Sequence, residues 1–181
     1  INEIANFCEA WGADVDDVKE GLGLDHRIGK SFLNAGVGFG GSCLPKETRA
    51  FTSLASNYGI KSKLLESVLE VNEYQSQIPF RIIKDVFADM NNVKVGILGM
   101  SFKAQSDDIR SSLSYKLKKI LKINTKEVLT TDPFVKNDKE ILPLKTILEK
   151  SDILILATPH KIYQNLKTKK PLIDIWNFVK K

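Results

Sequence analysis

The run at residues 36–47, GVGFGGSCLPKE, places one cysteine between a glycine-rich segment and a predicted helix start. Proline is favoured in the first turn of a helix, so Pro45 predicts that Cys43 lies just before a helix N-terminus. The helix dipole and the unpaired N–H groups there favour the thiolate, and Lys46 adds positive charge. Few side chains would surround the sulfur, and backbone amides could approach a ligand closely. These residues alone fit a nucleophilic cysteine or a structural turn with a buried cysteine equally well.

The first ninety residues predict helices around this loop. Ile4, Phe7, Cys8 and Trp11 recur at helical spacing, which predicts an amphipathic helix with Cys8 in the core. Further helices are predicted from about residue 14, over 45–57 and over about 61–90. Pro79 interrupts the last of these and either kinks one helix or starts another. A stretch of this length predicts a spine that joins domains or subunits.

The second half alternates short apolar runs with helical patterns. The predicted strands span 93–98, 127–131, 153–157 and 172–175, and the predicted helices span 107–121 and 144–149 and follow Pro159. Continuous apolar strands that alternate with helices indicate a parallel sheet covered on both faces. The expected fold class is therefore α/β, with an all-helical central dimerisation domain over 1–91 and a small Rossmann-like, doubly wound domain over 92–181.

Composition excludes several classes of protein. Of the 181 residues, 43% are hydrophobic and 27% charged, which is typical of a soluble globular protein without a membrane-spanning run. The net charge of +5 divides into −4 over residues 1–90 (nine basic, thirteen acidic) and +9 over 91–181 (eighteen basic, nine acidic). The lysines are scattered along the elements, which argues against nucleic acid and leaves a smaller anionic ligand. Two cysteines suit free thiols in a reducing cytoplasm, and the two histidines lack metal-ligand spacing.

The string GFGGSCLPKE closely resembles the active-site loop of the UDP-glucose 6-dehydrogenase family, which includes GDP-mannose and related nucleotide-sugar dehydrogenases. Further matches follow in order: residues 1–34, LEVNEYQ, ILGMSFKAQSDDIRSS and TTDP. The family's N-terminal NAD-binding domain would precede Ile1, so the resemblance implies a fragment with the central and nucleotide-sugar-binding domains. It also implies a homodimer that oxidises a nucleotide sugar for surface polysaccharide synthesis.

The resemblance implies a four-electron oxidation of the sugar C6 hydroxyl to a carboxylate, with reduction of two NAD⁺. Cys43 matches the nucleophile that forms a thiohemiacetal and then a thioester. Asn2 matches an asparagine that hydrogen-bonds the reacting oxygen. Glu47 stands where relatives usually carry an aspartate that positions water or transfers protons, and its extra methylene moves the carboxylate.

Other matches assign the binding residues. The segment that holds the nucleotide sugar corresponds to Phe32, Leu33, Asn34, Ala35, Gly36 and Gly40. Lys103 matches a substrate-binding lysine, and Arg27 matches an arginine that reaches a neighbouring subunit. Lys46 and Arg110 match cofactor-side cations.

Simpler interpretations stand beside these matches. Phe32 and Leu33 fit core packing, and Arg27 fits a solvated surface charge. Asp107 and Asp108 fit helix capping. Gly96 and Gly99 do not form the dinucleotide-binding GxGxxG pattern.

One departure bears on the substrate. Many relatives carry an arginine in a stretch that resembles DGRN, whereas this chain has Trp176 in DIWN. UDP-glucose is the first expectation, with a UDP-N-acetylhexosamine or another nucleotide sugar as the alternative. A binding and dimerisation module without turnover is the second hypothesis. A cysteine hydrolase is the third, although neither His26 nor His160 has a sequence context that pairs it with Cys43.

Overall fold

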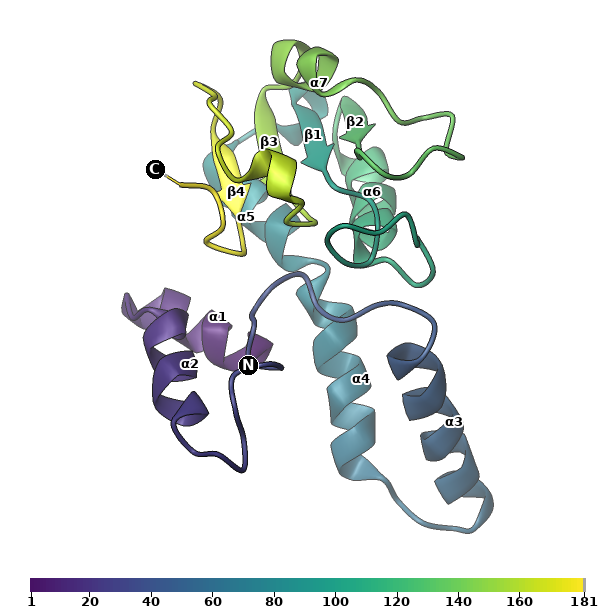
Figure 1. Cartoon of the computed structure of the whole chain (residues 1–181). Coiled ribbons are helices and arrows are strands. Elements are labelled where there is room, and N and C mark those ends of the chain that lie inside the picture. Colours follow the sequence, from purple (N-terminus) through teal and green to yellow (C-terminus); the bar gives the residue numbers. More distant parts are fainter. Residues whose placement is uncertain (181) are drawn as a thin grey trace.

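Two pairs of helices precede the sheet in this computed structural model, which describes residues 1–180. The first pair is α1 (Asn2–Trp11) and α2 (Val15–Gly23), and the second is α3 (Leu44–Asn57) and α4 (Lys63–Gln75). Gly12 ends α1 in the left-handed conformation with φ of 70°, as its position predicts, and the Asp14 side chain caps α2. The glycine-rich connection runs between the two pairs and passes near the upper end of α4 (Figure 1).

The long helical stretch at 61–90 is two helices, because α4 ends at Gln75 and α5 spans Ile78–Val86. Pro79 lies in the first turn of α5, where its missing N–H costs nothing, so the proline starts a second helix. The α5 residue Ile83 is fully buried in the same core as the sheet residues. This helix therefore joins the α3–α4 pair to the sheet.

The sheet has four parallel strands in the order β2-β1-β3-β4. They are β1 (Lys94–Leu98), β2 (Glu127–Thr131), β3 (Ile153–Leu156) and β4 (Leu172–Asp174), with α6 (Leu113–Asn124) and α7 (Leu144–Lys150) between them. Short 3₁₀ turns occur at Met90–Asn92 and Lys161–Tyr163. The chain leaves β1 for β2 on one side and later returns to place β3 on the other, so the strand order reverses beside β1.

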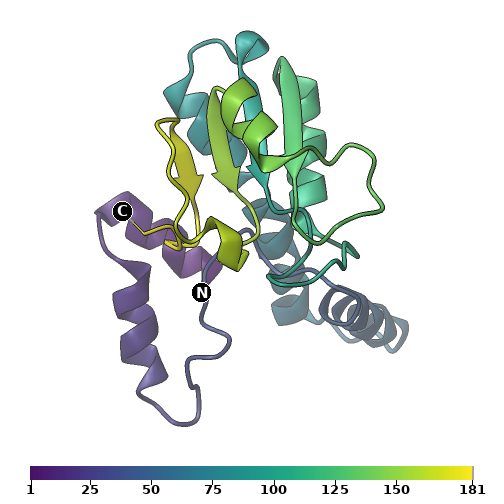
Figure 2. The ribbon, with the colours of Figure 1, turned by 45° about the horizontal axis from the view of Figure 1, so that its top comes forward.

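Successive strand residues are buried on opposite faces of the sheet. Ile97 and Ile155 pack with α5 and α6, whereas Leu98 and Leu156 pack with α7 and the C-terminal segment. Helices accordingly lie in front of and behind the strands (Figure 2). The predicted α/β class with a doubly wound parallel sheet is confirmed. Across residues 1–180, no helix combines the length and the apolar character that spanning a bilayer demands.

Two predicted helices differ from the structure. The helix expected over 107–121 begins only at Leu113, because backbone groups before it bind neighbouring loops. The Asp108 carbonyl accepts the Phe102 N–H, and the Arg110 carbonyl accepts the Gly41 N–H. The helix expected after Pro159 is the single 3₁₀ turn at Lys161–Tyr163.

Replacing Ile83 tests the joint between the helical part and the sheet. We expect Ile83→Ala to lower the free energy of unfolding by about 2–4 kcal/mol, because a fully buried side chain is removed from a packed core. Val86→Ala on the same helix is the control, since Val86 is 59% exposed. Urea denaturation followed by circular dichroism measures both, and equal midpoints for the two variants would contradict this packing.

Candidate functional site

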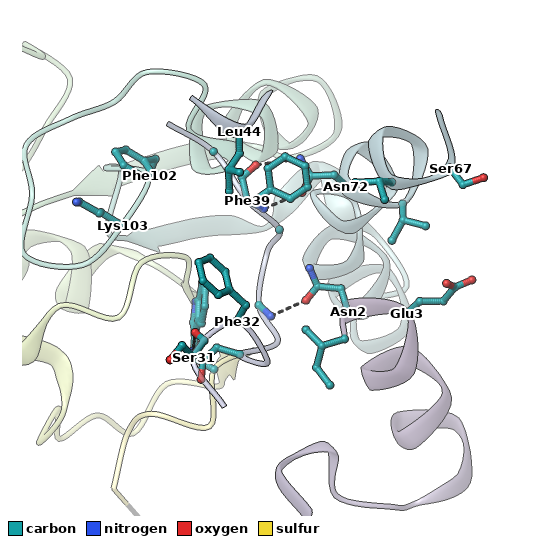
Figure 3. A pocket seen from close by; sticks show the side chains of 18 of the residues that line it. Asn2, Glu3, Ser31, Phe32, Phe39, Leu44, Ser67, Asn72, Phe102 and Lys103 are labelled. Atoms are coloured by element: carbon teal, nitrogen blue, oxygen red, sulfur yellow. Dashed lines mark hydrogen bonds between the residues drawn. The ribbon is translucent and has the colours of Figure 1, made fainter. Parts of the chain in front are cut away.

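A cleft of about 670 Å³ lies between the glycine-rich loop, the α4 helix and the loop that follows β1 (Figure 3). It therefore sits near the carboxyl ends of the strands, beside the reversal of strand order, where doubly wound sheets bind ligands. The lining residues are Ile1, Asn2, Glu3, Ser31, Phe32, Asn34, Gly36, Gly38, Phe39, Gly40, Leu44, Leu64, Ser67, Val68, Val71, Asn72, Phe102, Lys103 and Trp176. Six residues predicted from the sequence are among them: Asn2, Phe32, Asn34, Gly36, Gly40 and Lys103.

Carboxamide side chains fix the glycine-rich loop to the helices. Asn2 Oδ1 accepts the Gly36 N–H at 2.9 Å, and Gln75 Nε2 donates to the Gly36 carbonyl at 2.9 Å. Asn72 makes a closed pair with Phe39: its Oδ1 accepts the Phe39 N–H at 2.7 Å and its Nδ2 donates to the Phe39 carbonyl at 2.9 Å. The bonds of Asn2 and Asn72 to the loop are visible in Figure 3. Because Asn72 and Gln75 are buried, these bonds hold the loop in one conformation.

Close contacts hold the same loop against the sheet domain. A Cβ on Gly36 would overlap the Trp176 ring, and one on Gly41 would overlap the Phe102 ring. The Gly41 N–H also donates to the Arg110 carbonyl at 2.9 Å. From the sequence, we expected these glycines to let a ligand approach the backbone closely. The structure adds a second reason, which is that protein groups from the other half of the chain occupy the space of their side chains.

Cys43 is exposed and occupies the N-cap position of α3, immediately before Leu44. The predicted placement at a helix N-terminus is confirmed, and the alternative of a buried structural cysteine is wrong. Its Sγ lies 3.7 Å from Ser42 Oγ. Within residues 1–180 the lining of the cleft includes Gly40 and Leu44 but not Cys43 itself, so Cys43 is adjacent in sequence to a lining residue without lining the cleft.

Lys46 and Arg110, the two cations that the sequence predicted on the cofactor side, are exposed. Arg110 donates from Nε and Nη2 to the Asp108 carboxylate, with the Nη2–Oδ2 distance at 2.6 Å. The hydrogen bond from Arg110 lowers the pKa of Asp108 to about 2, and the hydrogen bond to Asp108 raises the pKa of Arg110. Asp108 thus pairs with Arg110, and the alternative of a helix cap is wrong because α6 begins later. Lys46 Nζ lies 3.5 Å from Glu47 Oε1, and both side chains are exposed.

The remaining predicted residues are placed differently. Phe32 is 88% exposed at the cleft, so simple core packing is wrong for this side chain. Leu33 is half-buried and, within residues 1–180, does not line the cleft. Ala35 lines a second cleft, between α1 and β4. Arg27 is exposed and hydrogen-bonded to Asp25, as a surface charge would be.

Sequence reasoning did not assign a role to Asn72 or Gln75. Both lie in the matching string LEVNEYQ, three residues apart and therefore on one face of α4. Two carboxamides at that spacing on a helix with apolar residues on its other positions, such as Val68 and Val71, were the available signal. The structure shows that they act on the loop backbone.

The histidines have partners other than Cys43. His26 is exposed, with Nδ1 at 4.0 Å from Asp25 Oδ1, and His160 is fully buried with bonds to both ring nitrogens. A cysteine hydrolase therefore has no histidine base supported by these contacts. In the part of the chain that the structure describes, no three His, Cys, Asp or Glu side chains gather as metal ligands would.

Comparison with known protein families gives two matches in chain order. The central-domain model of the UDP-glucose/GDP-mannose dehydrogenase family matches residues 1–74, and the UDP binding domain model of the same family matches residues 96–181. The chain belongs to this family. The matched segments contain the two walls of the cleft, since Asn2, Gly36 and Asn72 lie in the first and Lys103 and Trp176 in the second.

Individual relatives are similar over nearly the whole chain. A UDP-glucose 6-dehydrogenase of Rickettsia prowazekii is 36% identical over 191 residues, covering 99% of this chain and 43% of the relative. A UDP-glucose dehydrogenase structure from Pyrobaculum islandicum is 29% identical with a TM-score of 0.91, covering 98% of this chain and 43% of that one. A UDP-D-ManNAc dehydrogenase structure from Pyrococcus horikoshii is 25% identical with a TM-score of 0.85, covering 99% and 44%. The chain thus spans less than half of the length of these family members.

Removing the Asn72 carboxamide tests its hold on the loop. We expect Asn72→Ala to lower the free energy of unfolding by about 2 kcal/mol, because the Phe39 N–H and carbonyl lose their partners in a buried setting. Amide exchange at Phe39 should become faster. Asn57→Ala, at the exposed end of α3, is the control, and protection of Phe39 that is unchanged in Asn72→Ala would contradict this role.

Proposed function

We propose that this chain forms the sugar-binding and cysteine-bearing part of an NAD-dependent nucleotide-sugar 6-dehydrogenase that oxidises UDP-glucose to UDP-glucuronate. The observation that carries the proposal is the cleft itself. Its walls come from the central and UDP-binding segments, and the exposed Cys43 directly precedes Leu44, which lines the cleft.

The proposed chemistry divides the oxidation into two hydride losses. The C6 hydroxyl first loses a hydride and a proton to give an aldehyde, and the Cys43 sulfur attacks this carbon to form a thiohemiacetal. Loss of a second hydride, together with the hydroxyl proton of the thiohemiacetal, gives a thioester, which water cleaves to the carboxylate with return of the thiol. Asn2, a cleft residue, is suited to donate a hydrogen bond to the reacting oxygen. Glu47, in the first turn of α3, is suited to orient the water or take its proton.

Two molecules of NAD⁺ are the proposed acceptors, one for each hydride. The residues near Cys43 fit an anionic dinucleotide, because Lys46 and Arg110 are exposed cations and Asp108 holds the Arg110 guanidinium in place. These two side chains would hold its phosphates. Gly96 and Gly99 are not assigned to NAD⁺. Neighbouring protein atoms occupy the space that a Cβ on either residue would need, so close packing explains both glycines.

The substrate-binding set is proposed to be Phe32, Leu33, Asn34, Ala35, Gly36, Gly40 and Lys103. Phe32 and Lys103 offer an exposed ring and a cation inside the cleft. Trp176 replaces the arginine of many relatives and packs on Gly36, so the wall there is apolar. The names of the relatives support UDP-glucose, and one structural neighbour named for a UDP-N-acetyl sugar keeps that class as the alternative.

The protein is further proposed to act as a cytoplasmic homodimer in which Arg27 reaches the neighbouring subunit. Large apolar side chains on the helical pairs support an association, since Trp11 on α1 is 83% exposed and Phe51 on α3 is 61% exposed. A binding and dimerisation module without turnover is the second candidate. The observation that favours it is that, within residues 1–180, Cys43 is not among the residues that line the cleft.

Turnover separates the two candidates. We expect no NADH formation from the 181-residue chain with NAD⁺ and UDP-glucose, and NADH formation once an NAD-binding domain is supplied upstream. In that longer protein Cys43→Ala should lower kcat by more than about a thousandfold, because the thioester route is lost. Cys8→Ala is the matched control, as Cys8 is buried in α1. Equal turnover of Cys43→Ala and Cys8→Ala would contradict the thioester mechanism.

Calorimetric competition tests the substrate class. Titrations with UDP-glucose, UDP-N-acetylglucosamine and GDP-mannose should give the lowest Kd for UDP-glucose. Trp176→Arg should shift the preference among the sugars, because it replaces an apolar wall of the cleft with a cation. Equal Kd values for all three ligands in both proteins would rule out this specificity.

A further inference from the structure

The loop that carries Lys103 has no regular secondary structure and connects β1 to α6. Its conformation therefore depends on bonds to other segments. Thr158 Oγ1 donates to the Ser101 carbonyl at 2.7 Å, and the Lys161 N–H donates to Gln105 Oε1 at 3.0 Å. Both partners come from the segment after β3, so that segment supports the Lys103 loop.

His160 lies in the same supporting segment and is fully buried. Its Nδ1 accepts the Gln105 N–H at 3.0 Å. A backbone N–H can only donate, so Nδ1 carries a lone pair and the ring proton is on Nε2. That nitrogen faces Asp132 Oδ2 at 3.0 Å and Ser101 Oγ at 3.2 Å. The imidazole thus joins the Lys103 loop to the end of β2.

Asp132 and Ser101 extend this connection to both sides of Lys103. Asp132 Oδ2 accepts the Met100 N–H at 2.7 Å and the Ser101 N–H at 3.0 Å. Ser101 Oγ donates to the Lys103 carbonyl at 2.9 Å, which leaves its oxygen to accept from His160. Burial raises the pKa of Asp132, but its bonds to His160 and to backbone N–H groups outweigh this and lower the pKa. The carboxylate is therefore charged when the network forms.

These three side chains do not form a hydrolytic triad. In such a triad the serine and the aspartate bind opposite nitrogens of the imidazole. Here both face Nε2, and the loop backbone occupies Nδ1. The rings of Phe134 and Tyr163, with centroids 5.1 and 5.8 Å from that of His160, enclose it further. The arrangement suits a fixed support for the loop.

We propose that His160 is a positioning residue for the cleft: its acceptance of the Gln105 N–H places Lys103 against the nucleotide sugar. This inference rests on the proposed function in one respect, because it takes Lys103 as a ligand-binding residue. The positioning itself is a property of the ligand-free chain and can be measured without a ligand.

Two substitutions of His160 separate its two bonds. His160→Asn keeps an acceptor near the place of Nδ1, whereas His160→Gln keeps a donor near the place of Nε2. Both remove the ring, so both lose its packing. Only His160→Gln leaves the Gln105 N–H without an acceptor, which makes the pair a matched comparison.

The experiment uses the 181-residue chain with UDP as the probe. His160→Gln should raise the Kd for UDP about tenfold, the size of one lost hydrogen bond, and should speed amide exchange at Gln105. His160→Asn should stay within about threefold of wild type and retain slower exchange at Gln105. Lys103→Ala gives the increase in the Kd for UDP that follows when the cation itself is removed.

Each remaining outcome decides the inference. Equal Kd values for the two His160 variants, with equal exchange at Gln105, would overturn it. Failure of wild type to bind UDP would count against the proposed function, and the exchange comparison would then decide the positioning role alone. If neither variant folds, the wild-type imidazole is observed by ¹⁵N NMR: a proton on Nε2 supports the inference, and a proton on Nδ1 overturns it.

Discussion

The close approach of the glycine-rich loop to both halves of the chain is the constraint on which the site depends. On one side, carboxamides of α1 and α4 bind the backbone of Gly36 and Phe39. On the other side, the rings of Trp176 and Phe102 occupy the space that glycine side chains would need. A loop held in this way cannot shift without breaking contacts with both halves. The loop therefore fixes the position of the cleft and the position of Cys43 at the N-terminus of α3.

The parallel sheet supplies the second wall through its topology. The strand order reverses beside β1, so the segments after β1, β2 and β3 meet at one edge. Asp132 and His160 come from two of these segments and bind the third, which carries Phe102 and Lys103. Cys43 and Lys103 are thus held by different parts of the structure. A helix terminus positions the first, and a buried polar network positions the second.

Much of this arrangement could be predicted from the sequence. The stripe at Ile4, Phe7, Cys8 and Trp11, the continuous apolar strands and Pro45 each predict an element by local rules, and the structure contains those elements. The position of Cys43 at a helix start also follows from neighbouring residues alone, whereas its exposure was decided only by the structure.

Other features depend on contacts that are distant in the chain. The late start of α6 results from backbone bonds to the loops at Gly41 and Phe102, which no local propensity encodes. His160 is 55 residues from its partner Gln105, and Asn72 is 33 residues from Phe39. The packing of Trp176 on Gly36 likewise requires the two halves to be brought together. These long-range contacts explain why the supporting residues were missed while the residues in the motifs were found.

A crystal structure of the chain with UDP-glucose bound is the most direct test of the account. We expect the nucleotide sugar to lie in the cleft between the Gly36–Gly40 segment and Lys103, with the glucose C6 turned toward the Cys43 sulfur. A ligand bound in the cleft between α1 and β4 instead, or one whose C6 faces away from Cys43, would contradict it.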